Sequence, residues 1–149
     1  MADEFEIAVV ERADEALVQS VDRLIRQLSS SPSPRTPTLD ELRAMLQSPS
    51  TTLLVARAAD RSPIGMLALV VFRIPTGVRA FIEDVVVDRQ FRGRGVGAAL
   101  TRRALDLAVG SGARTVELTS RPERVAANAL YRKLGFERRG TSMYRYTPR

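Results

Sequence analysis

The sequence predicts an α/β fold, a mixed and largely antiparallel sheet with one central parallel strand pair, flanked by helices. Three apolar segments separated by short turns follow one another over residues 51–88, the order of an antiparallel meander. The last of them leads through a glycine-rich loop into a helical pattern and then another strand pattern, a unit whose two strands run parallel. Because 149 residues suit one hydrophobic core, we expect a single domain over residues 1–149.

The first third of the chain predicts one strand and two helices. Residues 5–12 alternate apolar and polar side chains, which is typical of a strand. Asp14 can cap a helix that ends near Leu28, and Thr38 or Asp40 can cap a second helix over residues 39–47. Between them, residues 29–38 contain three prolines and must form a loop. A loop of this length suits a lid over a binding site or a plain surface connection.

The middle and the end of the chain supply the remaining elements. We expect strands at residues 51–58, 64–74 and 78–88, the second of which is almost wholly apolar and therefore central. A helix follows the glycine loop and ends near Val109, before a strand at 115–119. Pro122 can start a last helix, which Gly135 ends. Residues 136–139 and 142–146 then predict a hairpin of two strands.

The segment of residues 81–100 carries the strongest functional signal, because a strand passes into a helix through a loop with three glycines at alternate positions. The first N–H groups of a helix have no internal partner, and the helix dipole adds positive charge there. Glycines let such groups converge on a phosphate or pyrophosphate. The alternative is a tight turn that only closes a corner. The residues concerned are Arg92, Gly93, Arg94, Gly95, Val96, Gly97 and Ala98.

Composition narrows the classes of function. The net charge of +6 is typical of a nucleic-acid-binding protein. The arginines are nevertheless scattered along the sequence and form only a modest cluster near the loop. A small phosphate-rich cofactor explains that cluster more economically than a nucleic acid does. The chain has no Cys and no His, which excludes an acyl-cysteine intermediate and leaves acid–base work to Asp, Glu, Tyr, Lys133 or water. We expect no metal, no membrane segment and a cytoplasmic location.

Two other phosphate-binding folds fit less well. Gly93, Gly95 and Ala98 also satisfy the dinucleotide fingerprint, but the loop follows four strands and precedes only one strand–helix–strand unit. Glu117 sits inside its strand, whereas a ribose-binding acid ends one. The Gly-Lys-Ser/Thr of a P-loop is absent from the sequence.

Two motifs resemble the GNAT family of N-acetyltransferases. The first is Arg92-Gly93-Arg94-Gly95-Val96-Gly97, and the second is the stretch from Ala127 to Phe136, which includes Leu130-Tyr131 and Gly135-Phe136. The resemblance implies the GNAT fold and acetyl-CoA as the cofactor. The chain departs from the pattern at Arg89, where a proline is usual. It departs again at Arg124, where an asparagine often contacts the cofactor.

The resemblance also implies roles for individual residues. The amides of Gly93 to Ala98 would take the pyrophosphate, and the backbone around Val85 would pair with the pantetheine arm and supply an oxyanion donor. Asn128, one helical turn after Arg124, is the candidate for the missing asparagine contact. Arg124 itself could bind a phosphate or be a solvated helix residue, and we favour the second interpretation. The implied cofactor-binding set is Val85, Val86, Val87, Arg92, Gly93, Arg94, Gly95, Val96, Gly97, Ala98 and Asn128.

Tyr131 and Glu83 are the implied catalytic pair. Tyr131 would act as the general acid toward the leaving thiolate, although a core tyrosine is the alternative. Glu83, two residues before Val85 and so expected on its face, would accept a proton from the amine directly or through water, with Glu117 in reserve. The alternative for Glu83 is a surface or salt-bridged carboxylate.

The sequence therefore predicts direct transfer of acetyl from acetyl-CoA to a primary amine of a small molecule or a protein. The alternatives are a non-catalytic acyl-CoA-binding regulatory module and a basic nucleic-acid-binding domain. Carboxylates at Glu83, Asp84 and Glu117 favour a cationic acceptor, whose identity the sequence does not give. We expect no nucleic-acid or membrane partner, and the resemblance allows a homodimer.

Overall fold

The computed structural model describes residues 4–149, which form two compact units. The first unit ends at Thr119, and the second runs over Ser120–Arg149. Each unit is described by itself below. Within residues 4–149, no helix is both long and apolar enough to cross a membrane.

The first unit is built on a five-stranded sheet in the order β1-β2-β3-β4-β5. The first four strands pair antiparallel and β5 pairs parallel to β4, which confirms the mixed sheet. The two terminal strands are shorter than the sequence predicts, since the expected ends were residues 12 and 119. The strands are β1 (Phe5–Val9), β2 (Thr51–Ala58), β3 (Pro63–Ile74), β4 (Gly77–Val87) and β5 (Thr115–Glu117).

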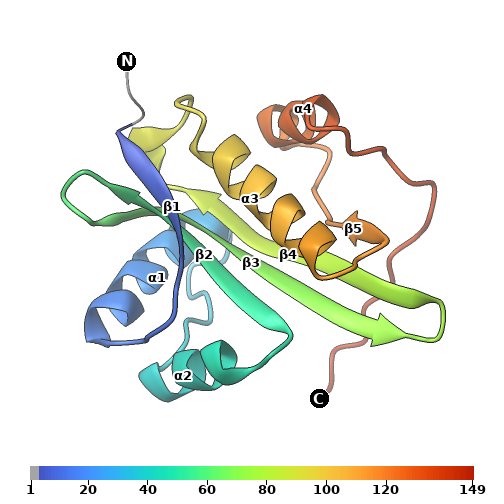
Figure 1. Cartoon of the computed structure of the whole chain (residues 1–149). Helices are drawn as coiled ribbons and strands as arrows, with labels where there is room; N and C mark the ends of the chain where they lie inside the picture. Colours follow the sequence, from blue (N-terminus) through green and yellow to red (C-terminus); the bar gives the residue numbers. More distant parts are fainter. Residues whose placement is uncertain (1–3) are drawn as a thin grey trace. The chain divides into compact units, whose positions relative to one another are not determined.

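Three α-helices cover the two faces of this sheet. α1 (Glu15–Leu28) and α2 (Leu39–Gln47) lie over one face, and α3 (Val96–Gly110) lies over the other (Figure 1). The caps are those that the sequence predicts. The Asp14 side chain accepts from the Leu17 amide at 2.8 Å, and Thr38 forms a capping box with Glu41. Each cap satisfies amides that the first turn leaves unpaired.

The alternation of side chains along the strands decides which helix each residue meets. Met66 belongs to the buried cluster beneath α1 and α2, together with Leu53 and Val86. Its neighbour Gly65 faces α3, where a Cβ would come within 3.2 Å of the Leu100 and Val96 side chains. The absence of a side chain at residue 65 therefore lets the start of α3 pack closely on the sheet.

A bulge interrupts β4 near its end. Ala68 of β3 faces Glu83 and Met66 faces Val86, so one β3 residue stands opposite two β4 residues, Asp84 and Val85. Asp84 has φ of 52°, in the left-handed region that few non-glycine residues adopt. Because the extra residue reverses the alternation, Val86 and not Val85 shares the face of Glu83. The sequence prediction that Glu83 and Val85 share a face is wrong for this reason.

The second unit contains one helix, α4 (Val125–Lys133), which begins three residues after Pro122. Gly135 has φ of 99° and ends the helical segment, as predicted. No strand forms after it, so the predicted hairpin of residues 136–139 and 142–146 is wrong. Met143, Tyr144 and Tyr146 are 68%, 92% and 87% exposed, and this segment therefore buries no apolar face that would stabilise a strand pair.

Candidate functional site

The loop between β4 and α3 has the backbone of an anion-binding site. Gly93 and Gly95 have φ of 76° and 83°, and a Cβ at either position would meet no atom within 4 Å, so open space surrounds both. The first helical hydrogen bond of α3 runs from the Ala99 amide to the Gly95 carbonyl at 3.0 Å. The amides of Val96, Gly97 and Ala98 come before this first bond, have no partner within the helix and are free to bind a phosphate.

α1 holds the start of this loop in place. Asp88 is only 8% exposed, accepts from the Gln90 amide at 3.1 Å and forms an ion pair with Arg23. The other Arg23 nitrogen donates to the Pro63 carbonyl at 2.6 Å, and Gln27 accepts from the Arg89 amide at 2.9 Å. The sequence does not predict the contacts that Arg23 and Gln27 make, because their partners lie 40 to 65 positions further along the chain.

The two loop arginines fold back onto their own unit. Arg92 donates through Nε to the Val87 carbonyl at 3.2 Å. The guanidinium of Arg94 lies 5.2 Å from the centre of the Phe91 ring, a cation–π geometry. Both side chains are exposed, so their charge stays available to an anion beside the glycines.

One edge of β4 is left without a strand partner over the predicted cofactor segment. β5 pairs only with Arg79, Ala80 and Phe81, and from Ile82 onward no strand within residues 4–149 pairs on that side. Val85 to Val87 therefore present main-chain groups on this edge. The Val87 carbonyl already accepts from Arg92, and an extended amide could join the remaining groups as an added strand. Glu117 is the last residue of β5, opposite Phe81, so the prediction that it sits inside its strand is wrong. It stays an alternative to Glu83 as the base.

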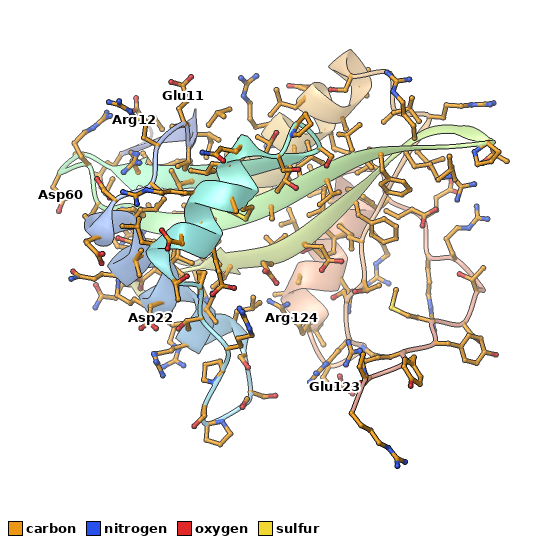
Figure 2. The ribbon with its side chains drawn as sticks, turned by 90° about the horizontal axis from the view of Figure 1, so that it is seen from below. Glu11, Arg12, Asp22, Asp60, Glu123 and Arg124 are labelled. Carbon is orange, nitrogen blue, oxygen red and sulfur yellow. The ribbon has the colours of Figure 1, made fainter. Side chains whose placement is uncertain are left out.

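The bulge brings two carboxylates together. Desolvation by burial and, second, the charge of Asp84 raise the pKa of Glu83 above its usual 4.5. Asp84 lines a cavity of about 290 Å³ on the α1/α2 face of the sheet, together with Arg35 and Pro37 of the proline-containing loop. That loop is thus part of a cavity wall. Figure 2 shows it projecting from α1 and α2.

Tyr131 is the buried side chain of the second unit. It is 8% exposed, and its ring lies 5.8 Å from that of Phe136 at an interplanar angle of 65°. Burial raises the pKa of the Tyr131 phenol above 10.0, and the charge of Arg124 lowers it by less. Arg124, labelled in Figure 2, is exposed and precedes the first turn of α4. The Asn128 amide nitrogen donates to the Arg121 carbonyl at 2.9 Å, so this donor is already used within the unit.

Comparison with known proteins identifies the family. Residues 19–136 match the model of the acetyltransferase (GNAT) family, which is most of the chain. The chain belongs to the GNAT family. A putative acetyltransferase from Agrobacterium tumefaciens str. C58 has the same fold at a TM-score of 0.80 and 27% identity, covering 95% of this chain and 99% of that one. The GNAT-like fold predicted from the sequence is therefore confirmed.

Two curated GNAT relatives differ in their named substrates. The chain is 35% identical over 115 residues to mycothiol acetyltransferase from Beutenbergia cavernae, which is 74% of this chain and 38% of the relative. It is 42% identical over 65 residues to probable glucosamine 6-phosphate N-acetyltransferase 2 from Oryza sativa subsp. japonica, which is 44% of this chain and 37% of the relative. The chain thus spans less than two fifths of the length of these relatives.

GNAT proteins use acetyl-CoA as a co-substrate, and the residues of the first unit fit such a molecule. The free amides at the start of α3 suit its pyrophosphate, and the unpaired edge of β4 suits its amide-containing arm. Among residues 4–149, no group of three or more metal-ligating acidic side chains lies close together.

Proposed function

We propose that this protein transfers the acetyl group of acetyl-CoA directly to a primary amine. The observation that carries the proposal is a single strand–loop–helix segment with three features. It contains an unpaired strand edge, a carboxylate of raised pKa (Glu83) directly before a bulge, and a glycine loop with free amides. A cofactor-binding module without chemistry has no need of the carboxylate.

The cofactor would lie along the first unit from the β4 edge to the start of α3. The backbone of Val85 to Val87 would bind the arm, and the amides of Gly93 to Ala98 would bind the pyrophosphate, with charge support from Arg92 and Arg94. Acetyl-CoA supplies the acyl group as a thioester. In the second unit, Asn128 would contribute its carbonyl oxygen, since its nitrogen is engaged.

Glu83 is the proposed general base. A primary amine is protonated at neutral pH and must lose a proton before its nitrogen can form a bond to the acyl carbon. Glu83 accepts that proton directly or through water, and its raised pKa makes it a better acceptor than an ordinary carboxylate. In the net reaction a C–N bond forms, the C–S bond breaks, and the departing sulfur takes up a proton.

Tyr131 is the proposed source of the proton for sulfur. Its raised pKa keeps the phenol protonated through neutral pH, which a general acid requires. Replacing Tyr131 by Phe keeps the ring and its contact with Phe136 and removes only the hydroxyl. We expect kcat to fall about 10- to 100-fold with acetyl-CoA affinity unchanged. An unchanged kcat would remove Tyr131 from this role.

The proposal is tested by calorimetric titration with acetyl-CoA, followed by thiol release measured across a panel of primary amines. We expect saturable binding and release of CoA that depends on the amine. Binding without release for any amine would favour the regulatory acyl-CoA-binding module instead. If acetyl-CoA does not bind, the assignment of the glycine loop is wrong.

A further inference from the structure

The cavity beside Asp84 has an apolar interior. Its floor comes from the sheet, through Leu53, Met66 and Ala68, and its walls include Ile25 of α1 and Met45 of α2. Leu53 and Met66 are buried, whereas Ile25 and Met45 are half-buried at the cavity surface. With a volume of about 290 Å³, the cavity is near the lower limit for small-molecule sites. It can take a group the size of one ring or one large side chain.

Only three of the described residues that line the cavity are polar, namely Arg35, Glu41 and Asp84. Arg35 and Glu41 form an ion pair with each other, and Glu41 also accepts from the Thr38 amide at 3.2 Å. Asp84 forms no ion pair with any residue of the described chain. The lining therefore carries one uncompensated negative charge, at the rim of an apolar space.

The bulge directs this charge to the position where the proposed reaction occurs. The left-handed backbone of Asp84 puts its side chain in the cavity lining, and Glu83 stands opposite Ala68, which is part of the cavity floor. The two carboxylates and the apolar space are thus contiguous within the first unit. A molecule that fills the cavity can present a cationic nitrogen to both carboxylates.

We infer that the acceptor is a primary amine carried on a compact apolar group, which fills the cavity while its ammonium lies at Glu83 and Asp84. This inference rests on the proposed function. The chemistry is shared by free arylalkylamines and by the N-terminal residue of a peptide with an apolar side chain. Polyhydroxylated amino sugars fit poorly, because hydroxyl groups entering the cavity would lose water without gaining partners.

The first test compares amines of rising apolar size by thiol release at saturating acetyl-CoA. Across ethylamine, butylamine and phenylethylamine, we expect KM to fall about fourfold for each methylene buried. We expect kcat/KM for glucosamine to lie at least about 30-fold below that for phenylethylamine. Peptides with N-terminal Leu or Ser are tested alongside these amines, to distinguish a peptide N-terminus from a free arylalkylamine as the acceptor. Preference for the Leu peptide over phenylethylamine assigns a peptide acceptor, and the reverse assigns a free amine.

The second test changes the lining. Met45→Gln keeps the size of the side chain and makes it polar, so KM for phenylethylamine should rise about tenfold while KM for ethylamine stays the same. Asp84→Asn removes the charge but keeps a residue type that tolerates positive φ, so KM should rise about tenfold for both amines. Arg43→Gln, on α2 but outside the cavity, is the matched control and should change neither value.

The outcomes separate this inference from the proposal on which it rests. Absence of thiol release with every amine, despite acetyl-CoA binding, would contradict the proposed function. Release with glucosamine preferred to phenylethylamine would overturn the inference and leave the acetyltransferase function standing. The same follows if Met45→Gln affects ethylamine and phenylethylamine equally. In every variant, an unchanged affinity for acetyl-CoA shows that the fold is intact.

Discussion

The two ends of β4 differ in pairing and in chemistry. From Gly77 to Ile82 the strand faces β3 residue for residue, and over Arg79 to Phe81 it also pairs with β5. Phe81 stacks with Phe72 of β3 there, with ring centres 6.1 Å apart. From Glu83 to Val87 the strand is bulged, paired on one side only, and carries two exposed carboxylates.

Each end also borders a hollow of about 290 Å³, but the linings are opposite in charge. The hollow at the β3–β4 turn is lined by Thr76, Arg79, Arg114 and Thr115, whereas the cavity at the bulge is apolar with one free carboxylate. The cationic acceptor that we propose would therefore be attracted to the bulged end and repelled from the other. Pairing on both sides stabilises one end of β4, whereas interrupted pairing at the other end leaves backbone groups and carboxylates available for the binding and the chemistry that we propose.

The largest expected effect comes from the loop that follows the bulged end. Gly95→Asp places a carboxylate at the start of α3, where we propose that the pyrophosphate binds, and like-charge contact should lower acetyl-CoA affinity about 100-fold or more. Gly112→Asp is the matched control, because Gly112 has nearly the same φ, 86°, in equally open space beyond the other end of α3. If calorimetry shows the same loss of acetyl-CoA affinity in both variants, the loss comes from backbone strain and not from charge at the pyrophosphate site.

Glu83→Gln should separate activity from stability. We expect kcat to fall about 100-fold. In the unchanged protein, activity should rise with pH as Glu83 deprotonates, through a pKa above 4.5. This rising limb of the pH–activity profile should vanish in the variant. Because the folded-state pKa is raised, Glu83 favours folding only at low pH, and this contribution is lost as pH rises through that pKa. At neutral pH the variant should therefore unfold no more readily than the parent in urea. If Glu117→Gln abolishes the limb instead, Glu117 is the base.

Arg23→Gln tests the support of the loop from α1. The substitution leaves Asp88, which is buried, without its charged partner, and the free energy of unfolding should fall by about 2 kcal/mol. Arg26→Gln, one turn further along α1, breaks the exposed pair with Asp22 and should have little effect. The free energy of unfolding of both variants is measured by chemical denaturation. Equal decreases would mean that the Arg23–Asp88 pair stabilises the fold no more than the exposed pair does.

The smallest effect is expected at the paired end. Phe72→Leu keeps a large apolar side chain but removes the stacking with Phe81, and it should lower the free energy of unfolding by about 1 kcal/mol. Because Phe72 lies far along β3 from the bulge, kcat and KM should stay within about twofold of the parent values. A tenfold change in either would show that the two ends of β4 are not independent.

The sequence by itself determined the features that depend on neighbouring residues. Asp14 and Thr38 cap their helices because their side chains reach amides three residues away. The glycine loop was predictable because only glycine readily adopts the backbone found at Gly93 and Gly95. The short turns between three apolar segments likewise predicted the meander of β2, β3 and β4, and the GNAT motifs predicted the family.

Only the tertiary structure decided the features that join distant segments. The bulge at Asp84 exists only in the register with β3, and it changed which valine shares the face of Glu83. The Arg23–Asp88 pair and the apolar cavity bring together residues from separate elements. No local sequence pattern predicts either feature. The predicted C-terminal hairpin failed for the same reason, because alternation favours a strand only where a partner edge and a buried face are available.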